Sequence, residues 1–199
     1  MDLFSAPRAR KVRRTTSSTD PLDHKPSTPD LPADIDRALG IIRSTLVDCD
    51  DLVIRELSLT EALIRVAILY IDGMVDSRIV NSSIIQNIVA DSRADPAGAY
   101  SSAKEVFRRI QHMALGVGSV RMEADVHELV TVLLVGQRVI LVDGQKEALL
   151  ADGMSPPGRS ITEPSAESII RGPRESFVEL QRINTALLRK HLRTPDLKL

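Results

Sequence analysis

Cysteine and aromatic residues are scarce in this chain. Its 199 residues include one cysteine, Cys49, and no tryptophan, and aromatic residues make up only 3%. A single cysteine excludes an internal disulfide and any metal site built from several cysteines, and we expect Cys49 to be a half-buried thiol just after a helix. Because the hydrophobic content is still 43%, a core has to be built from isoleucine, leucine and valine.

An excess of charge and long apolar runs are also missing. The formal net charge of −1 gives no overall attraction to nucleic acids or membranes. No apolar run approaches the roughly 18–20 residues of a membrane-spanning helix, and one of the longer runs, 129–135, is far too short. The first residues contain no apolar segment typical of a secretion signal. We therefore expect a soluble chain that is not exported by that route.

Residues 1–31 have the composition of a disordered tail. Proline, serine, threonine and aspartate dominate from 15 to 32, without hydrophobic periodicity. Basic residues cluster within the tail at Arg8, Arg10, Lys11, Arg13 and Arg14. Such a cluster suits a contact with anionic lipid or nucleic acid, or it is simply a solvated charge run. No aromatic residue lies between these bases, which weakens the interpretation as a single-strand binder.

Residues 32–199 alternate between helix-like and strand-like patterns. The apolar run 62–71 contains only one charged residue, Arg65, which is typical of a strand covered on both faces. The patterns predict an α/β domain (mixed α+β), with a small mixed sheet of about five strands and helices packed on it. Helices are expected near 33–47, 76–89, 102–116, 125–136 and 173–193. Strands are expected at 52–57, 62–71, 120–122, 138–142, 146–150 and 168–170.

Turn and cap residues mark several of these boundaries. Ser102 with Glu105, and Asp125 with Glu128, have the spacing of helix-capping boxes. A loop is expected over 91–100. Asp143-Gly144 predicts a short hairpin turn, because both central positions of such a turn need a positive φ.

Six stretches of the chain follow an order known from one family. They are DLVIREL (51–57), LYIDGMVD (69–76), LLVGQRVILVDGQKEALL (133–150), RSITEP (159–164), IIRGPRESFVE (169–179) and LLRKHLRTPDLK (187–198), with Asn184 between the last two. In this order they resemble the A-subunit family of bacterial spore germinant receptors, the GerA type. The resemblance covers roughly residues 39–199.

The resemblance implies a function and a location. It implies a non-catalytic domain on the cytoplasmic side of the spore inner membrane, taking part in nutrient sensing or signal relay during germination. It further implies B and C subunits as partners, an amino acid, sugar or nucleoside as a possible ligand, and no nucleic acid. Residues 32–199 correspond to the first of two related halves of the family's soluble region, and the membrane half is absent from this chain.

Motifs for catalysis, metals and cofactors are missing from the sequence. The four histidines (His24, His112, His127 and His191) have no metal-binding spacing. A Gly-rich phosphate loop and a G-x-S-x-G elbow are also missing. We therefore expect no enzyme, no metal and no cofactor. A hydrolase, the rival interpretation, requires a pocket lined by groups with shifted pKa values.

The first candidate ligand site follows the most apolar strand. Ligands tend to bind beyond the carboxyl ends of strands, and Tyr70, Asp72 and Asp76 are placed to line such a pocket. The alternative is an ordinary turn with a helix cap at Asp76.

The second candidate site is the segment Arg171-Gly172-Pro173-Arg174-Glu175, at the start of an expected helix. Free N–H groups at a helix start and an arginine side chain favour an anion. Alternatively, Glu175 pairs with Arg171 and holds the segment closed from within. Asn184, further along the same helix, is an additional ligand or switch candidate. The expected apolar face of this helix consists of Phe177, Leu180, Ile183, Leu187 and Leu188.

A second function class remains open beside the receptor domain. The basic tail suits an adaptor that binds a membrane surface or nucleic acid. This alternative predicts binding that collapses with salt and with deletion of residues 1–30.

Overall fold

The computed structural model describes residues 29–59, 64–76, 85–94, 102–115, 119–152, 177 and 179–198. Its helices are α1 (Ile35–Thr45), α3 (Gln86–Ala94), α4 (Ala103–Leu115), α5 (Val126–Leu134) and α6 (Gln181–Leu192). Its strands are β1 (Leu52–Leu59), β2 (Ile64–Ile71), β3 (Val120–Glu123), β4 (Arg138–Val142) and β5 (Ala148–Ala151). No helix in these ranges is both long and apolar enough to cross a membrane.

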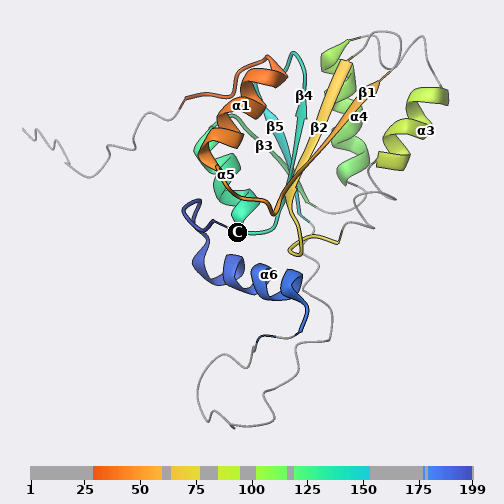
Figure 1. Ribbon diagram of the computed structural model, residues 1–199. Helices are drawn as coiled ribbons and strands as arrows, with labels where there is room; N and C mark the ends of the chain where they lie inside the picture. The colour runs from red at the N-terminus through yellow and green to blue at the C-terminus, as the bar shows by residue number, and fades with distance from the viewer. Residues whose placement is uncertain are drawn as a thin grey trace, which may run out of the picture.

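The strands form one sheet in the order β1-β2-β4-β5-β3 (Figure 1). The predicted fold class, about five strands with helices packed on the sheet, is confirmed. All pairings between these strands run antiparallel, so the sheet is antiparallel where the sequence predicted a mixed one. In the β1–β2 hairpin Leu52 is paired with Ile71, so Asp51 and Asp72 lie next to each other at its open end. The backbone N–H of Asp72 donates to the carbonyl oxygen of Asp51 at 2.7 Å.

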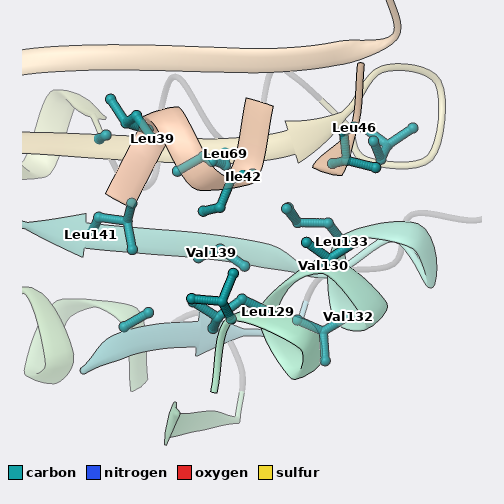
Figure 2. Close-up of a cluster of buried hydrophobic side chains, with 14 of the residues drawn as sticks. Leu39, Ile42, Leu46, Leu69, Leu129, Val130, Val132, Leu133, Val139 and Leu141 are labelled. Carbon is teal, nitrogen blue, oxygen red and sulfur yellow. The ribbon is translucent and has the colours of Figure 1, made fainter. Parts of the chain in front are cut away.

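Helices cover both faces of the sheet. On one face α1 and α5 pack against alternate residues of β2 and β4, including Leu69 and Leu141 (Figure 2). On the other face α3 and α4 pack against the intervening residues, including Ile68 and Ile140. Because side chains alternate along a strand, a strand between two helical layers is apolar throughout. The continuous run in β2 is therefore buried on both faces, as its sequence predicts.

The N-terminal end of α1 is held by two aspartates. Asp34 caps the helix and accepts a hydrogen bond from the backbone N–H of Arg37 at 2.8 Å. Asp143 accepts from the backbone N–H of Ile35 at 3.1 Å. Just before the helix, Leu31 is only 3% exposed, and Asp30 forms a β-bridge with Asp125. The folded part therefore includes Asp30 and Leu31, at the end of the expected tail.

The β4–β5 connection is wider than the Asp143-Gly144 motif predicts. The strands end at Val142 and restart at Ala148, and only Gly144 of the pair has a positive φ, +83°. Asp143 is instead committed to tertiary contacts, because its backbone N–H donates to the carbonyl oxygen of Arg65. The predicted hairpin is correct, but the predicted short turn is wrong.

Two helix boundaries also differ from the prediction. Helix α3 continues to Ala94, where the sequence suggests a loop from Asp91, and Asp91 pairs with Arg109 of α4 at 2.7 Å. Helix α6 begins at Gln181, whereas the sequence predicts a helix running on from Pro173. Phe177 and Leu180 are 65% and 64% exposed, so these two apolar side chains bury little surface that would stabilise an earlier start of the helix.

The capping predictions are confirmed in part. The hydroxyl of Ser102 accepts from the backbone N–H of Glu105 at 3.3 Å, as its spacing predicts. The carboxylate of Glu105, however, pairs with Arg108 at 3.1 Å. Asp125 caps α5 and accepts a hydrogen bond from the backbone N–H of His127 at 2.8 Å. The strand predicted at 168–170 lies outside the described residues.

Candidate functional site

Helix α6 lies against the end of the sheet where the β1–β2 hairpin opens (Figure 1). Its residue Ala186 belongs to the same buried cluster as α1 and α5. Opposite it, Gly73 has a φ of +81°, and a Cβ at this position would lie 2.8 Å from the carbonyl oxygen of Arg182. The close approach of the helix therefore depends on glycine. We call this contact, formed by Asp51, Asp72, Gly73, Arg182, Ala186 and Arg189, the α6 junction.

A buried ion pair lies at the centre of the α6 junction. The Nε and Nη2 atoms of Arg189 donate to the two carboxylate oxygens of Asp51 at 2.9 and 2.8 Å. Its Nη1 atom donates to the carbonyl oxygen of Thr194 at 3.0 Å. The side chains of Arg189 and Asp51 are 0% and 9% exposed. All three guanidinium nitrogens are thus satisfied, which a buried arginine requires.

A second, exposed ion pair flanks the first. Arg182 binds Asp72 at 2.6 Å, with side chains that are 53% and 37% exposed. A backbone hydrogen bond joins Asp51 to Asp72. Both ion pairs therefore attach α6 to the same end of the β1–β2 hairpin. Water screens the outer pair, so it is expected to contribute much less to stability than the inner one.

The segment after α6 returns to the end of α1. Arg193 ends the helix in a left-handed conformation with a φ of +46°. The thiol of Cys49 lies at 3.8 Å from the carbonyl oxygen of Pro195 and at 3.5 Å from that of Leu197. Cys49 is 7% exposed, so the thiol expected to be half-buried is in fact buried beneath the C-terminal segment.

A third charge network lies away from the α6 junction. Arg65 binds both carboxylate oxygens of Asp36 at 2.6 and 2.8 Å and also binds Glu56 at 2.7 Å. Its hydrogen bond lowers the pKa of Asp36 below the usual value, and the same contact raises the pKa of Arg65. The network ties α1 to the β1–β2 hairpin.

Of the residues predicted to line a pocket after β2, Tyr70 and Asp72 have different surroundings. Tyr70 is 1% exposed and packs in the apolar cluster beneath α3 and α4. Asp72 binds Arg182 of α6. Asp76 is half-buried at the end of its described range. Asn184 is half-buried on α6, and the segment Arg171-Gly172-Pro173-Arg174-Glu175 lies outside the described residues.

Sequence reasoning missed Asp51, Arg182 and Arg189, although the sequence contains a signal for them. Arg182, Ala186 and Arg189 follow one another at spacings of four and three, so they share one face of a helix. Asp51 and Asp72 immediately flank the two strands of a hairpin. The positive charges on this helix face are complementary to the two negative charges at the end of the hairpin. The signal was hidden because the apolar residues alone defined the predicted face of this helix.

The α6 junction provides binding groups and no evident reactive group. The carboxylates of Asp51 and Asp72 are both occupied by arginines. Within the described ranges, no group of three or more His, Cys, Asp or Glu side chains is arranged to hold a metal ion. The arrangement holds α6 against the β1–β2 hairpin.

Comparison with known proteins points to one family. Residues 40–199 match the family model described as Bacillus/Clostridium GerA spore germination protein. Spore germination protein KA of Bacillus subtilis (strain 168) is 31% identical over 148 residues, which is 74% of this chain and 26% of that protein. Spore germination protein B1 of the same strain is 26% identical over 167 residues, covering 84% of this chain and 33% of that protein. The chain thus spans only about a quarter to a third of these relatives.

The fold has a counterpart among solved structures. The N-terminal domain of the A subunit of the Bacillus megaterium spore germinant receptor GerK3 superposes with a TM-score of 0.62 at 21% identity. The match covers 85% of this chain and 59% of that one. This similarity confirms the fold, while the family match over residues 40–199 establishes the relationship by sequence. The chain therefore belongs to the GerA family of spore germination proteins.

Proposed function

We propose that this chain is a non-catalytic N-terminal domain of a germinant receptor A subunit that takes part in nutrient sensing or signal relay. The observation that carries the proposal is the family match over residues 40–199, combined with a fold like that of the GerK3 A-subunit domain. In this proposal the domain faces the cytoplasm at the spore inner membrane and works with B and C subunits. A germinant such as an amino acid, sugar or nucleoside acts on the receptor as a whole.

The α6 junction supports a role in relay. Helix α6 is held by one buried and one exposed ion pair, and in this proposal breaking them releases the helix into a second arrangement. A ligand or subunit that binds one arrangement more tightly shifts the population toward it. In this proposal, docking of α6 on the β1–β2 hairpin is the contact through which the domain communicates with neighbouring parts of the receptor.

The experiment compares receptors in spores. Arg189→Met is introduced into the full-length receptor that contains this domain, with Arg182→Ala as the matched control on the same helix. We expect Arg189→Met to reduce the rate of nutrient-triggered germination by about tenfold or more, as a shift of 1.4 kcal/mol or more would. Arg182→Ala should reduce it far less. Germination by a nutrient-independent trigger should not change, and immunoblots should show equal receptor levels.

A receptor that lacks residues 29–199 and still germinates normally with nutrients would contradict the proposal. Location is tested separately, with a membrane-impermeant label on a cysteine placed at exposed Lys190. Labelling only in inside-out vesicles supports the cytoplasmic side, and labelling only in right-side-out vesicles contradicts it.

The segment from Arg171 to Glu175 remains a proposed ligand or switch site. We expect Arg171→Ala to loosen this segment, because the variant removes the guanidinium that would hold either an anion or Glu175. The readouts are the thermal midpoint of the chain and the germination rate. If neither changed, the segment would have no such role.

A further inference from the structure

A buried arginine at the start of β4 has donors without partners. Arg138 is 1% exposed, yet its Nε and Nη1 atoms have no hydrogen-bond partner among the described residues. Only its Nη2 atom is bound, to the backbone carbonyl oxygen of Asp152. Arg189, which is equally buried, has all three nitrogens satisfied. A buried guanidinium with unpaired N–H groups lowers the stability of the fold, so its presence here needs an explanation.

The position of Arg138 is fixed by the sheet. It is paired with Ala151 of β5 and lies two residues before Ile140, so it shares the face of the sheet that α3 and α4 cover. Burial lowers the pKa of Arg138, and the charge of Asp152 opposes this shift. An arginine nevertheless stays charged in proteins, so the positive charge persists although the side chain is buried.

The acid beside Arg138 is already occupied. The carboxylate of Asp152 accepts hydrogen bonds from the hydroxyl of Ser119 and from Nε2 of Gln137, the latter at 2.8 Å. Gln137 and Arg138 therefore converge on the same residue. The Oε1 atom of Gln137 is also buried without a partner. Two residues that bind Asp152 thus carry unpaired groups: Arg138 has two donors, Nε and Nη1, and Gln137 has one acceptor, Oε1.

We propose that Arg138 binds a small carboxylate. Asp152 compensates the charge of Arg138 only in part, because burial still lowers the pKa of the arginine. A neutral partner would satisfy the N–H groups and add no compensation, whereas a planar carboxylate would do both. The open Oε1 atom of Gln137 accepts a hydrogen bond from a hydroxyl or amino group beside that carboxylate. The class of ligand is therefore a small hydroxy or amino acid. The proposal does not depend on the role of the chain in germination.

The first test observes the arginine directly. In the full chain, the Nε–H resonance of Arg138 is followed by NMR during titration with sodium acetate and sodium glycolate, with chloride keeping the ionic strength constant. We expect a saturable shift for Arg138 and no shift for Arg189, whose donors are bound within the protein. Glycolate, with its added hydroxyl, should bind more tightly than acetate, and Gln137→Ala should remove that difference.

The second test measures thermal midpoints. Glycolate should raise the midpoint of the wild-type chain, because a ligand that binds only the folded state stabilises it. Arg138→Met should have a higher midpoint than the ligand-free wild type, since an apolar side chain replaces a buried charge with unpaired N–H groups, and it should not respond to glycolate.

Two results would overturn the proposal. One is an Nε–H of Arg138 that chloride shifts as much as carboxylates do. The other is an Nε–H that is strongly protected from exchange before any carboxylate is added, because the partner would then belong to the protein or to bound water.

Discussion

Arg189 of α6 binds both carboxylate oxygens of Asp51, a residue 138 positions earlier in the chain. Removal of one partner from such a buried pair leaves an uncompensated charge. We therefore expect Asp51→Ala to lower the free energy of unfolding by about 3–5 kcal/mol, measured by urea denaturation. The matched control Asp72→Ala breaks the exposed pair with Arg182 and should cost only about 0–1 kcal/mol.

The double variant Asp51→Leu/Arg189→Met separates charge from packing. If Asp51→Ala loses stability because the guanidinium of Arg189 is left buried without its partner, the double variant should be considerably more stable than Asp51→Ala. A double variant as unstable as Asp51→Ala would assign the loss to packing and contradict the electrostatic explanation.

Gly73→Ala should destabilise the chain. The new Cβ would lie 2.8 Å from the carbonyl oxygen of Arg182, on a residue whose φ is +81°. We expect a loss of about 1–3 kcal/mol in the free energy of unfolding, from backbone strain and displacement of α6. Gly40→Ala in α1 is the control, because a Cβ there meets nothing within 4 Å. It should increase stability by up to about 1 kcal/mol, and equal effects of the two variants would refute this account.

The stability of the chain should depend on pH through Asp36. Its pKa in the folded state is below the usual 3.8, because Arg65 donates hydrogen bonds to the carboxylate. The contribution of this contact is therefore present above pH 3.8 and is lost as the pH falls through the folded-state pKa. Asp36→Asn should flatten this part of the acid profile of the unfolding free energy. Asp50→Asn, at another exposed aspartate, should flatten it less.

The reactivity of Cys49 should report whether the C-terminal segment is in place. The thiol lies beneath the carbonyl groups of Pro195 and Leu197, so a thiol reagent reaches it only after local opening. We expect Arg189→Met to react at least about tenfold faster than the wild type under native conditions. Arg182→Ala should stay close to the wild-type rate. Equal rates in all three proteins would show that α6 and this segment open independently.

Much of the fold could be predicted because local patterns and global packing agree. The continuous apolar runs of β2 and β4 and the apolar stripe of α1 identify these elements, and the structure places them in one sheet between two helical layers. The prediction failed where a tertiary contact determines a turn or the start of a helix. The carboxylate of Asp143 accepts a hydrogen bond from the start of α1, and the residue does not form the predicted tight turn. Helix α6 begins next to Arg182, the residue that packs against Gly73.

The candidate site was predicted less well, for a related reason. Tyr70 and Asp72 are near neighbours in sequence, but Tyr70 lies within β2 and is buried in the apolar core, whereas Asp72 follows the last residue of the strand and binds Arg182 of α6. The partners Asp51 and Arg189 are joined only by folding, and no local pattern links them. For Arg171, Gly172, Pro173, Arg174 and Glu175, the sequence-based hypothesis stays a prediction.

The register of the β1–β2 hairpin places the two acids that bind α6 side by side. Asp51 and Asp72 become neighbours only when Leu52 is paired with Ile71, so a one-residue slip would remove the acceptor pair that α6 needs. The hairpin closes a short loop, whereas α6 closes one of 138 residues, which is entropically more costly. We therefore expect α6 to dock after the rate-limiting step of folding. Substitutions at the α6 junction should then accelerate unfolding while leaving the folding rate almost unchanged.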